Sequence, residues 1–159
     1  MSTQKDRLTV DRRKALQVVG GGVVAALLTG TLSHEAHADM KLVNEAINRL
    51  VGDGAMKEGR IKLDLPEIAE NGRTVPVGVM VESPMTDGDY VKSLHLFAEK
   101  NPAADVASLH FSPAMGEAKA ALRIRLGGTQ NVIAVAEMSD GTLYTSKQQI
   151  KVTIGGCGG

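Results

Sequence analysis

The chain ends in a cysteine placed among four glycines, Gly155-Gly156-Cys157-Gly158-Gly159, and it has no other cysteine. A thiol can act as a nucleophile or as a point of covalent attachment. Glycine has no Cβ and adopts backbone conformations that other residues avoid, so residues 155–159 are expected to form a flexible arm. Fully extended, five residues reach roughly 17 Å. The pattern favours a reactive group on a mobile arm that enters the active site of another protein.

Other interpretations of the same cysteine stay open from its spacing alone. Chain ends are often loose, and a lone thiol could instead form a disulfide with a second chain. Prenylation would need three residues after the cysteine, and only two follow Cys157. A metal site built on one cysteine with no nearby histidine is weakly supported. An unperturbed thiol is mostly protonated at pH 7, so activation of Cys157 is expected to come from a partner's active site.

The N-terminus has the order of charged, apolar and small residues that is typical of an export signal. Arg12-Arg13 precede a glycine-rich, moderately apolar stretch over residues 17–32, and Ala36-His37-Ala38 gives a small-x-small cleavage pattern. Paired arginines indicate the twin-arginine route. We therefore predict a twin-arginine signal peptide over residues 1–38 and a periplasmic protein. An uncleaved membrane anchor is the competing interpretation, which the glycines of the stretch disfavour.

Removal of residues 1–38 leaves 121 residues, which is enough for one domain with its own core. They carry 13 Lys and Arg against 15 Asp and Glu, a formal charge of −2. Such a domain has neither the positive surface nor, without tryptophan, the stacking platforms of a nucleic-acid-binding protein. We expect no nucleic acid as a partner, and no membrane after signal cleavage. In an oxidising compartment an unpaired cysteine is unusual, which again marks Cys157 as functional.

The remaining sequence predicts one helix followed by strands. Apolar residues recur at helical spacing over residues 42–50, and Gly52 follows them. Beyond residue 60 the apolar period changes to two, as in strands with one face in a core. Seven strands at this spacing predict a mainly β, immunoglobulin-like antiparallel sandwich over residues 39–154, with residues 155–159 as its arm. The strands are expected at residues 61–65, 74–81, 90–98, 106–112, 118–126, 132–138 and 142–154.

Turn signals separate several of these strands. Asn71-Gly72, Gly127-Gly128 and Asp140-Gly141 are each typical of β-hairpins. Pro76 and Gly78 would weaken a central strand, so residues 74–81 are predicted to lie at a sheet edge or at a bulge.

Chemistry elsewhere in the domain is sparse. His95 and His110 lie in similar apolar settings, and their rings would approach if their strands pair, but further metal ligands at suitable spacing are missing. Strand histidines that are either satisfied in the core or exposed to solvent are the favoured interpretation. Met80, Met85, Met115 and Met138 are scattered, which favours core filling over metal handling. No serine nucleophile motif, phosphate loop or paired carboxylate motif is present, so we expect a protein that is not itself an enzyme and needs no cofactor.

The sequence resembles the SoxY family. Members of that family are the sulfur-carrier subunits of the periplasmic thiosulfate-oxidising (Sox) multienzyme system. The ending Val152–Gly159, the segment Val81–Met85, the run Tyr90–Pro102 and the segment Val135–Gly141 all look like that family. The twin-arginine leader is similar too. The resemblance covers essentially the whole mature domain.

The resemblance implies an immunoglobulin-like sandwich that forms a heterodimer with SoxZ. It also implies that SoxAX, a haem enzyme, couples thiosulfate to Cys157 as an S-thiosulfonate, and that SoxB, a metal-dependent hydrolase, releases sulfate and leaves a persulfide. A sulfane dehydrogenase is a further transient partner where present. In this scheme Gly155, Gly156, Gly158 and Gly159 let the arm fit narrow channels.

Three rival functions belong to other classes. One is an exported immunoglobulin-like structural or interaction module that dimerises through a Cys157 disulfide. Another is a ubiquitin-like sulfur carrier that uses its terminal glycine, which the export signal argues against. The third is metal delivery through Met and His, which predicts stoichiometric copper binding.

Overall fold

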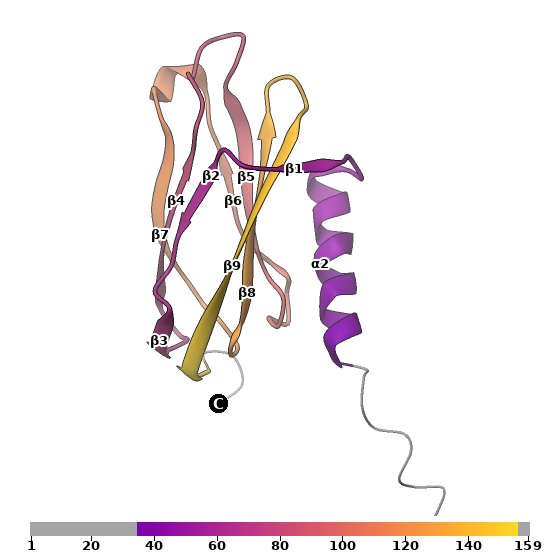
Figure 1. Ribbon diagram of the computed structural model, residues 1–159, viewed down its shortest axis with the longest axis vertical. Coiled ribbons are helices and arrows are strands. Elements are labelled where there is room, and N and C mark those ends of the chain that lie inside the picture. Colours follow the sequence, from indigo (N-terminus) through magenta and orange to yellow (C-terminus); the bar gives the residue numbers. More distant parts are fainter. Residues whose placement is uncertain (1–34, 156–159) are drawn as a thin grey trace, which may run out of the picture. The chain divides into compact units, whose positions relative to one another are not determined.

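A computed structural model of the chain describes residues 35–155 (Figure 1), and the exposure of side chains from Met40 onward. Most of the predicted signal peptide, residues 1–34, lies outside the described residues, as do Gly156, Cys157, Gly158 and Gly159. Among the residues described, no helix is both long and apolar enough to cross a membrane.

The predicted helix is present as α2 (Glu35–Val51) and begins earlier than its apolar stripe. Val43, Ala46 and Ile47 are buried, and all three lie beyond the predicted cleavage position. The helix ends just before Gly52, which has a left-handed φ of 83° and donates its N–H to the carbonyl of Asn48 at 3.1 Å. A glycine at this position is a common helix terminus because it has no Cβ to oppose positive φ. The part of α2 that packs is therefore retained if the signal peptide is removed.

The strands form two sheets that face each other, as predicted for a mainly β sandwich (Figure 1). The larger sheet has the order β1-β9-β8-β5-β6 with β3 also paired to β9, and the smaller sheet has the order β2-β4-β7. All seven predicted strands are present, and β1 and β3 are additional. The strands are β1 (Met56–Glu58), β2 (Ile61–Asp64), β3 (Ile68–Asn71), β4 (Val75–Val81), β5 (Val91–Ala98), β6 (Asp105–His110), β7 (Ala118–Ile124), β8 (Gln130–Met138) and β9 (Leu143–Ile154), with a short 3-10 turn at Pro113–Met115.

The two additional strands differ from the antiparallel pairing expected of the sandwich. Both β1 and β3 pair with β9 in parallel, β1 near its start and β3 near its end. Each has three or four residues, which is too short for a clear alternating pattern. Their position covers part of the outer edge of β9, and an uncovered edge strand is a site of unwanted pairing.

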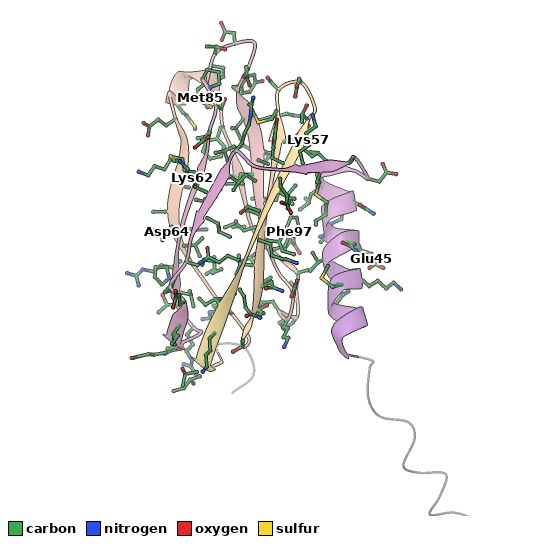
Figure 2. All side chains as sticks on the ribbon, in the orientation of Figure 1. Glu45, Lys57, Lys62, Asp64, Met85 and Phe97 are labelled. Atoms are coloured by element: carbon green, nitrogen blue, oxygen red, sulfur yellow. The ribbon has the colours of Figure 1, made fainter. Side chains whose placement is uncertain are left out.

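Burial on both faces of the larger sheet creates two apolar clusters. The main core lies between the sheets and includes the alternating valines of β4 together with Leu94 and Leu96 of β5. A second cluster lies between α2 and the opposite face of the larger sheet, where Phe97, Ile133 and Val135 meet the buried side of the helix. Figure 2 shows Phe97 between the larger sheet and α2. The larger sheet is thus a middle layer, which is why every residue from Ser93 to Ala98 is buried.

The predicted edge position of residues 74–81 is wrong, because β4 is the central strand of the smaller sheet. Along β4, only Gly78 to Val81 pair with β2, while the whole strand pairs with β7. Pro76 therefore lies where β4 has a partner on one side only, an edge-like position of the kind at which proline is tolerated in sheets. At Gly78 an added Cβ would lie 3.2 Å from the Cβ of Asp64, so this glycine allows β2 to approach closely.

Only one of the three predicted hairpin turns joins paired strands. Asp140-Gly141 connects β8 to its antiparallel neighbour β9, and Gly141 has a φ of 82°. By contrast, Asn71-Gly72 leads from β3 to β4 and Gly127-Gly128 leads from β7 to β8, and in each case the two strands belong to different sheets. These two turns are corners of the sandwich, and both lie beside the end of β9.

Candidate functional site

The predicted arm emerges from the end of β9, and Gly155 is the one arm residue that the structure describes. Cys157 lies two residues beyond it, outside the described residues. The site that can be built from the structure is therefore the root of the arm, which we define as Gly72, Gly127, Thr129, Ile154 and Gly155. In Figure 1 this end of β9 lies beside β3.

Hydrogen bonds hold the end of β9 although its pairing with β8 stops at Ile150. On one side β3 continues the sheet, with Ala69 opposite Val152 and Asn71 opposite Ile154. The Gly72 N–H then donates to the carbonyl of Ile154 at 2.7 Å, and the Leu126 N–H donates to the carbonyl of Gly72 at 2.8 Å. The backbone at Gly72 thus joins the last residue of the strand to the corner after β7.

On the other side of β9, Thr129 replaces the partner strand with its hydroxyl. Its Oγ1 accepts a hydrogen bond from the Val152 N–H at 3.0 Å and lies 3.4 Å from the Val152 carbonyl oxygen, to which it donates. A buried backbone group without a partner is costly, and Thr129 supplies one where the ladder has ended. The strand therefore keeps partners on both sides as far as Val152.

The corner over residues 125–130 is itself held by a buried amide, that of Gln130, which is 2 % exposed. Its Oε1 accepts from the Lys100 N–H at 2.6 Å, and its Nε2 donates to the Gly128 carbonyl at 3.1 Å and to Asn101 Oδ1 at 3.2 Å. Both amide hydrogens and the amide oxygen have partners, as expected of a buried side-chain amide. Gln130 therefore ties the corner to the loop that follows β5.

Asn101 extends the same network to Gly127. Its Oδ1 accepts from the Gly127 N–H at 2.9 Å, and its Nδ2 donates to the Arg125 carbonyl at 2.8 Å. Two side-chain amides thus fix the backbone on both sides of Leu126, which is fully buried. The Gly127 carbonyl is held in place at the point where the arm leaves the domain.

Gly155 passes close to that carbonyl. A Cβ built on Gly155 would lie 2.5 Å from the Gly127 carbonyl oxygen and 3.3 Å from its carbon. Both atoms belong to backbone, so neither can turn aside as the end of a long side chain would. The glycine at the first position of the arm is therefore required by local packing. Chemically, the arrangement is a firm root for the short segment that bears the thiol.

The two histidine rings do approach, because β5 and β6 pair with Ser93 opposite His110 and His95 opposite Ser108. Their ring centroids are 6.2 Å apart. His95 is buried, with Nδ1 2.8 Å from Ser108 Oγ and Nε2 3.1 Å from Ser93 Oγ. Burial lowers the pKa of His95, and the neighbouring His110 lowers it further, which favours a neutral ring. Both ring nitrogens have serine partners, so His95 is a satisfied core histidine as expected.

Other candidate sites are weaker. Within the described part of the chain, no three His, Cys, Asp or Glu side chains gather as metal ligands. Met85 and Met138 are buried in the core as predicted, but core filling is wrong for Met115, which is exposed. A cavity of about 500 Å³ lies between α2 and the β1–β9 edge, lined by residues that include Met40, Ile47, Met56 and Lys147. Among the described residues that line it, only Glu58 and Lys147 have titratable side chains, which is not a cluster suited to catalysis.

The sequence predicts the arm but not the residues that hold its first residue in place. Gly127-Gly128 is predicted as a turn, yet its contact with Gly155 joins positions far apart in the chain. The sequence does not predict the roles of Gln130 and Asn101, since a single glutamine or asparagine near a turn is common. Ile154 continues the apolar alternation of Ile150 and Val152, but it is 65 % exposed because the sandwich ends before it.

Comparison with known proteins identifies a family and similar solved structures. The family described as "Sulfur oxidation protein SoxY" matches residues 47–157, a region that ends at Cys157. The solved structure of the sulfur carrier protein SoxY from Chlorobium limicola f thiosulfatophilum is similar with 32% identity and a TM-score of 0.62, over 72% of this chain and 99% of that one. A comparison with curated proteins gave no match.

More distant structures share the fold alone. A variant of superoxide reductase (neelaredoxin) from Ignicoccus hospitalis has 19% identity and a TM-score of 0.54, over 68% of this chain and 86% of that one. A putative superoxide reductase from Thermotoga maritima has 19% identity and a TM-score of 0.53, over 61% of this chain and 93% of that one.

Proposed function

This chain belongs to the SoxY family of sulfur oxidation proteins, and on that premise we propose that it is a covalent sulfur carrier whose attachment point is Cys157. The arm of residues 155–159 presents the cysteine to separate enzymes in turn. The observation that carries the proposal is the family match that runs through to Cys157. The anchored end of β9 supports it, since a carrier needs its arm to start from a stable base.

The chemistry on Cys157 consists of two balanced steps. In the first, the thiolate and the outer sulfur of thiosulfate form a sulfur–sulfur bond, and the two electrons released pass to the haem enzyme SoxAX. The product is a cysteine S-thiosulfonate. In the second, water attacks the sulfonate sulfur in SoxB, so that sulfate and two protons leave and Cys157 keeps a persulfide. A sulfane dehydrogenase, where present, oxidises the remaining outer sulfur for another hydrolysis.

In this proposal the protein is the bound substrate of its partner enzymes and not a catalyst. The thiol is the nucleophile and the handle, and the activating groups belong to the enzyme that receives it. The sandwich then needs no cofactor of its own. Its task is to hold the arm and to be recognised.

Intact mass spectrometry tests the carrier function. Protein incubated with thiosulfate and oxidised SoxAX is expected to gain the mass of one thiosulfonate group, and digestion should place the added mass on the C-terminal peptide. Omission of SoxAX is the control, and it should leave the loaded species absent. A single unmodified mass after the complete reaction would contradict the proposal.

We also propose SoxZ as a stable partner. The outermost strands β6 and β7 each have one neighbour among the described residues, and half-buried apolar side chains such as Leu109 and Leu122 lie on them. Exposed strand edges of this kind are suited to covering by a second chain. Co-expression is expected to give a one-to-one complex on size-exclusion chromatography, with β6 and β7 amides protected from hydrogen exchange relative to the free protein. Elution of two separate monomers would count against the pairing.

Export through the twin-arginine route and cleavage after Ala38 belong to the same proposal. A route for folded cargo would let a partner without a signal travel with this chain. A periplasmic location also suits a thiol that is oxidised to a sulfur–sulfur bond as part of its function.

A further inference from the structure

We propose that Gly155 is the fixed root of the arm, so that the movable part begins at Gly156. This inference rests on the proposed carrier function and deepens it. The absence of a side chain at residue 155 serves close packing against the Gly127 carbonyl. Gly155 and Gly127 are thereby positioning residues for Cys157.

The first argument is steric. A Cβ on Gly155 would lie 2.5 Å from the Gly127 carbonyl oxygen, and its φ lies outside the left-handed range. The backbone conformation of Gly155 is thus open to other residues. The need for glycine therefore comes from the neighbouring carbonyl, which an alanine would displace.

The second argument is that the neighbouring carbonyl is held. The Gly127 N–H is bound by Asn101, Asn101 is bound by the buried Gln130, and the Leu126 N–H is bound by the Gly72 carbonyl. Satisfied buried networks of this kind rigidify the backbone that they contact. The Gly72 N–H in turn binds Ile154, the residue before Gly155. A larger residue 155 would have to break one of these contacts.

The consequence concerns the reach of the thiol. From a root at Gly155, Cys157 is two residues away, so its backbone extends only about 7 Å from the domain. An enzyme with a deep active site must then come against the end of the sandwich to receive the cysteine. The surface beside the root, including the exposed Ile154, becomes part of what each enzyme contacts. The thiol is thus delivered on a short arm whose first residue is fixed to the domain.

The experiment compares Gly155→Ala with the matched variant Gly156→Ala. In Gly155→Ala, hydrogen exchange at the Gly72 and Leu126 amides is expected to rise roughly 3- to 10-fold, the effect of a weakened hydrogen bond. Gly156→Ala should leave both amides at wild-type rates. Wild-type rates in Gly155→Ala as well would overturn the proposal.

Three further measurements separate the role of the root from folding and from sulfur transfer. In the wild-type protein, the nitrogen-15 order parameter of Gly155 is expected to match that of Ile154, near 0.85, whereas Gly156 falls below about 0.6. Equal mobility of the two glycines would contradict the proposal that Gly155 is fixed.

Reaction of Cys157 with a small disulfide reagent should proceed at the same rate in both variants. The KM of SoxAX for the carrier should rise in Gly155→Ala, with kcat retained. If the wild-type protein is never loaded with sulfur, the proposed carrier function is wrong. The hydrogen-exchange and relaxation data would still show whether Gly155 is fixed.

Discussion

Replacement of Cys157 by serine is expected to abolish sulfur loading completely and to stop thiosulfate oxidation in cells that depend on this chain. A serine oxygen cannot form the sulfur–sulfur bond that holds the thiosulfonate, and its hydroxyl is not ionised at neutral pH. The chain has no second cysteine to substitute for it. Residue 157 lies beyond the last residue of β9, so the variant should keep the wild-type melting temperature. The measurements are intact mass after incubation with SoxAX and thiosulfate, and growth on thiosulfate.

Deletion of Gly158 and Gly159 is the matched control for the serine variant. A carrier that uses the Cys157 thiol should still load after the deletion, at a lower rate, because the attachment point is intact. A carrier that uses the terminal carboxylate would lose all loading on deletion and none in Cys157→Ser. A structural module would lose only its disulfide-linked dimer on a non-reducing gel in Cys157→Ser, with thiosulfate oxidation unimpaired. Either of these two outcomes would remove Cys157 from the proposed role.

Replacement of Phe97 by alanine is expected to lower the free energy of unfolding by about 3–5 kcal/mol, the usual range for a buried aromatic residue. Phe97 is fully buried and lies in the cluster that joins α2 to the larger sheet. Removal of its ring leaves a cavity at that joint. Hydrogen exchange of the α2 amides should rise more than exchange in β4, which belongs to the other sheet. Denaturant unfolding with a hydrogen-exchange map checks both effects.

Phe111→Ala is the control for Phe97→Ala, because it removes the same group from the only other phenylalanine of the chain. Phe111 is half-buried at the edge of the main core, so the expected loss is only about 1–2 kcal/mol. Its effect on α2 exchange should be no larger than its effect elsewhere. Equal losses from the two variants, or an undisturbed helix in Phe97→Ala, would show that α2 does not depend on this contact.

The sequence by itself determined the helix and seven of the nine strands that the structure describes. Alternation located strands such as Val75–Val81, because a strand with one face in a core repeats every two residues. Gly52 marked the end of the helix for a local reason, its positive φ. The cysteine among glycines predicts that residues 155–159 are the functional segment. The resemblance to the SoxY family rests on residues along the whole domain, and the comparisons confirm it.

Only the tertiary structure decided how these elements meet. The outer face of β5 is buried because α2 lies over it, although α2 is distant in the sequence, so Phe97 could not be assigned to a second core in advance. Pro76 is tolerated in a central strand because β2 ends before reaching it. The role of Gly155 depends on Gly127, which lies 28 positions earlier and touches it only in the folded chain. Periodicity reports which face of an element is apolar, whereas these contacts depend on which other element covers that face and where it stops.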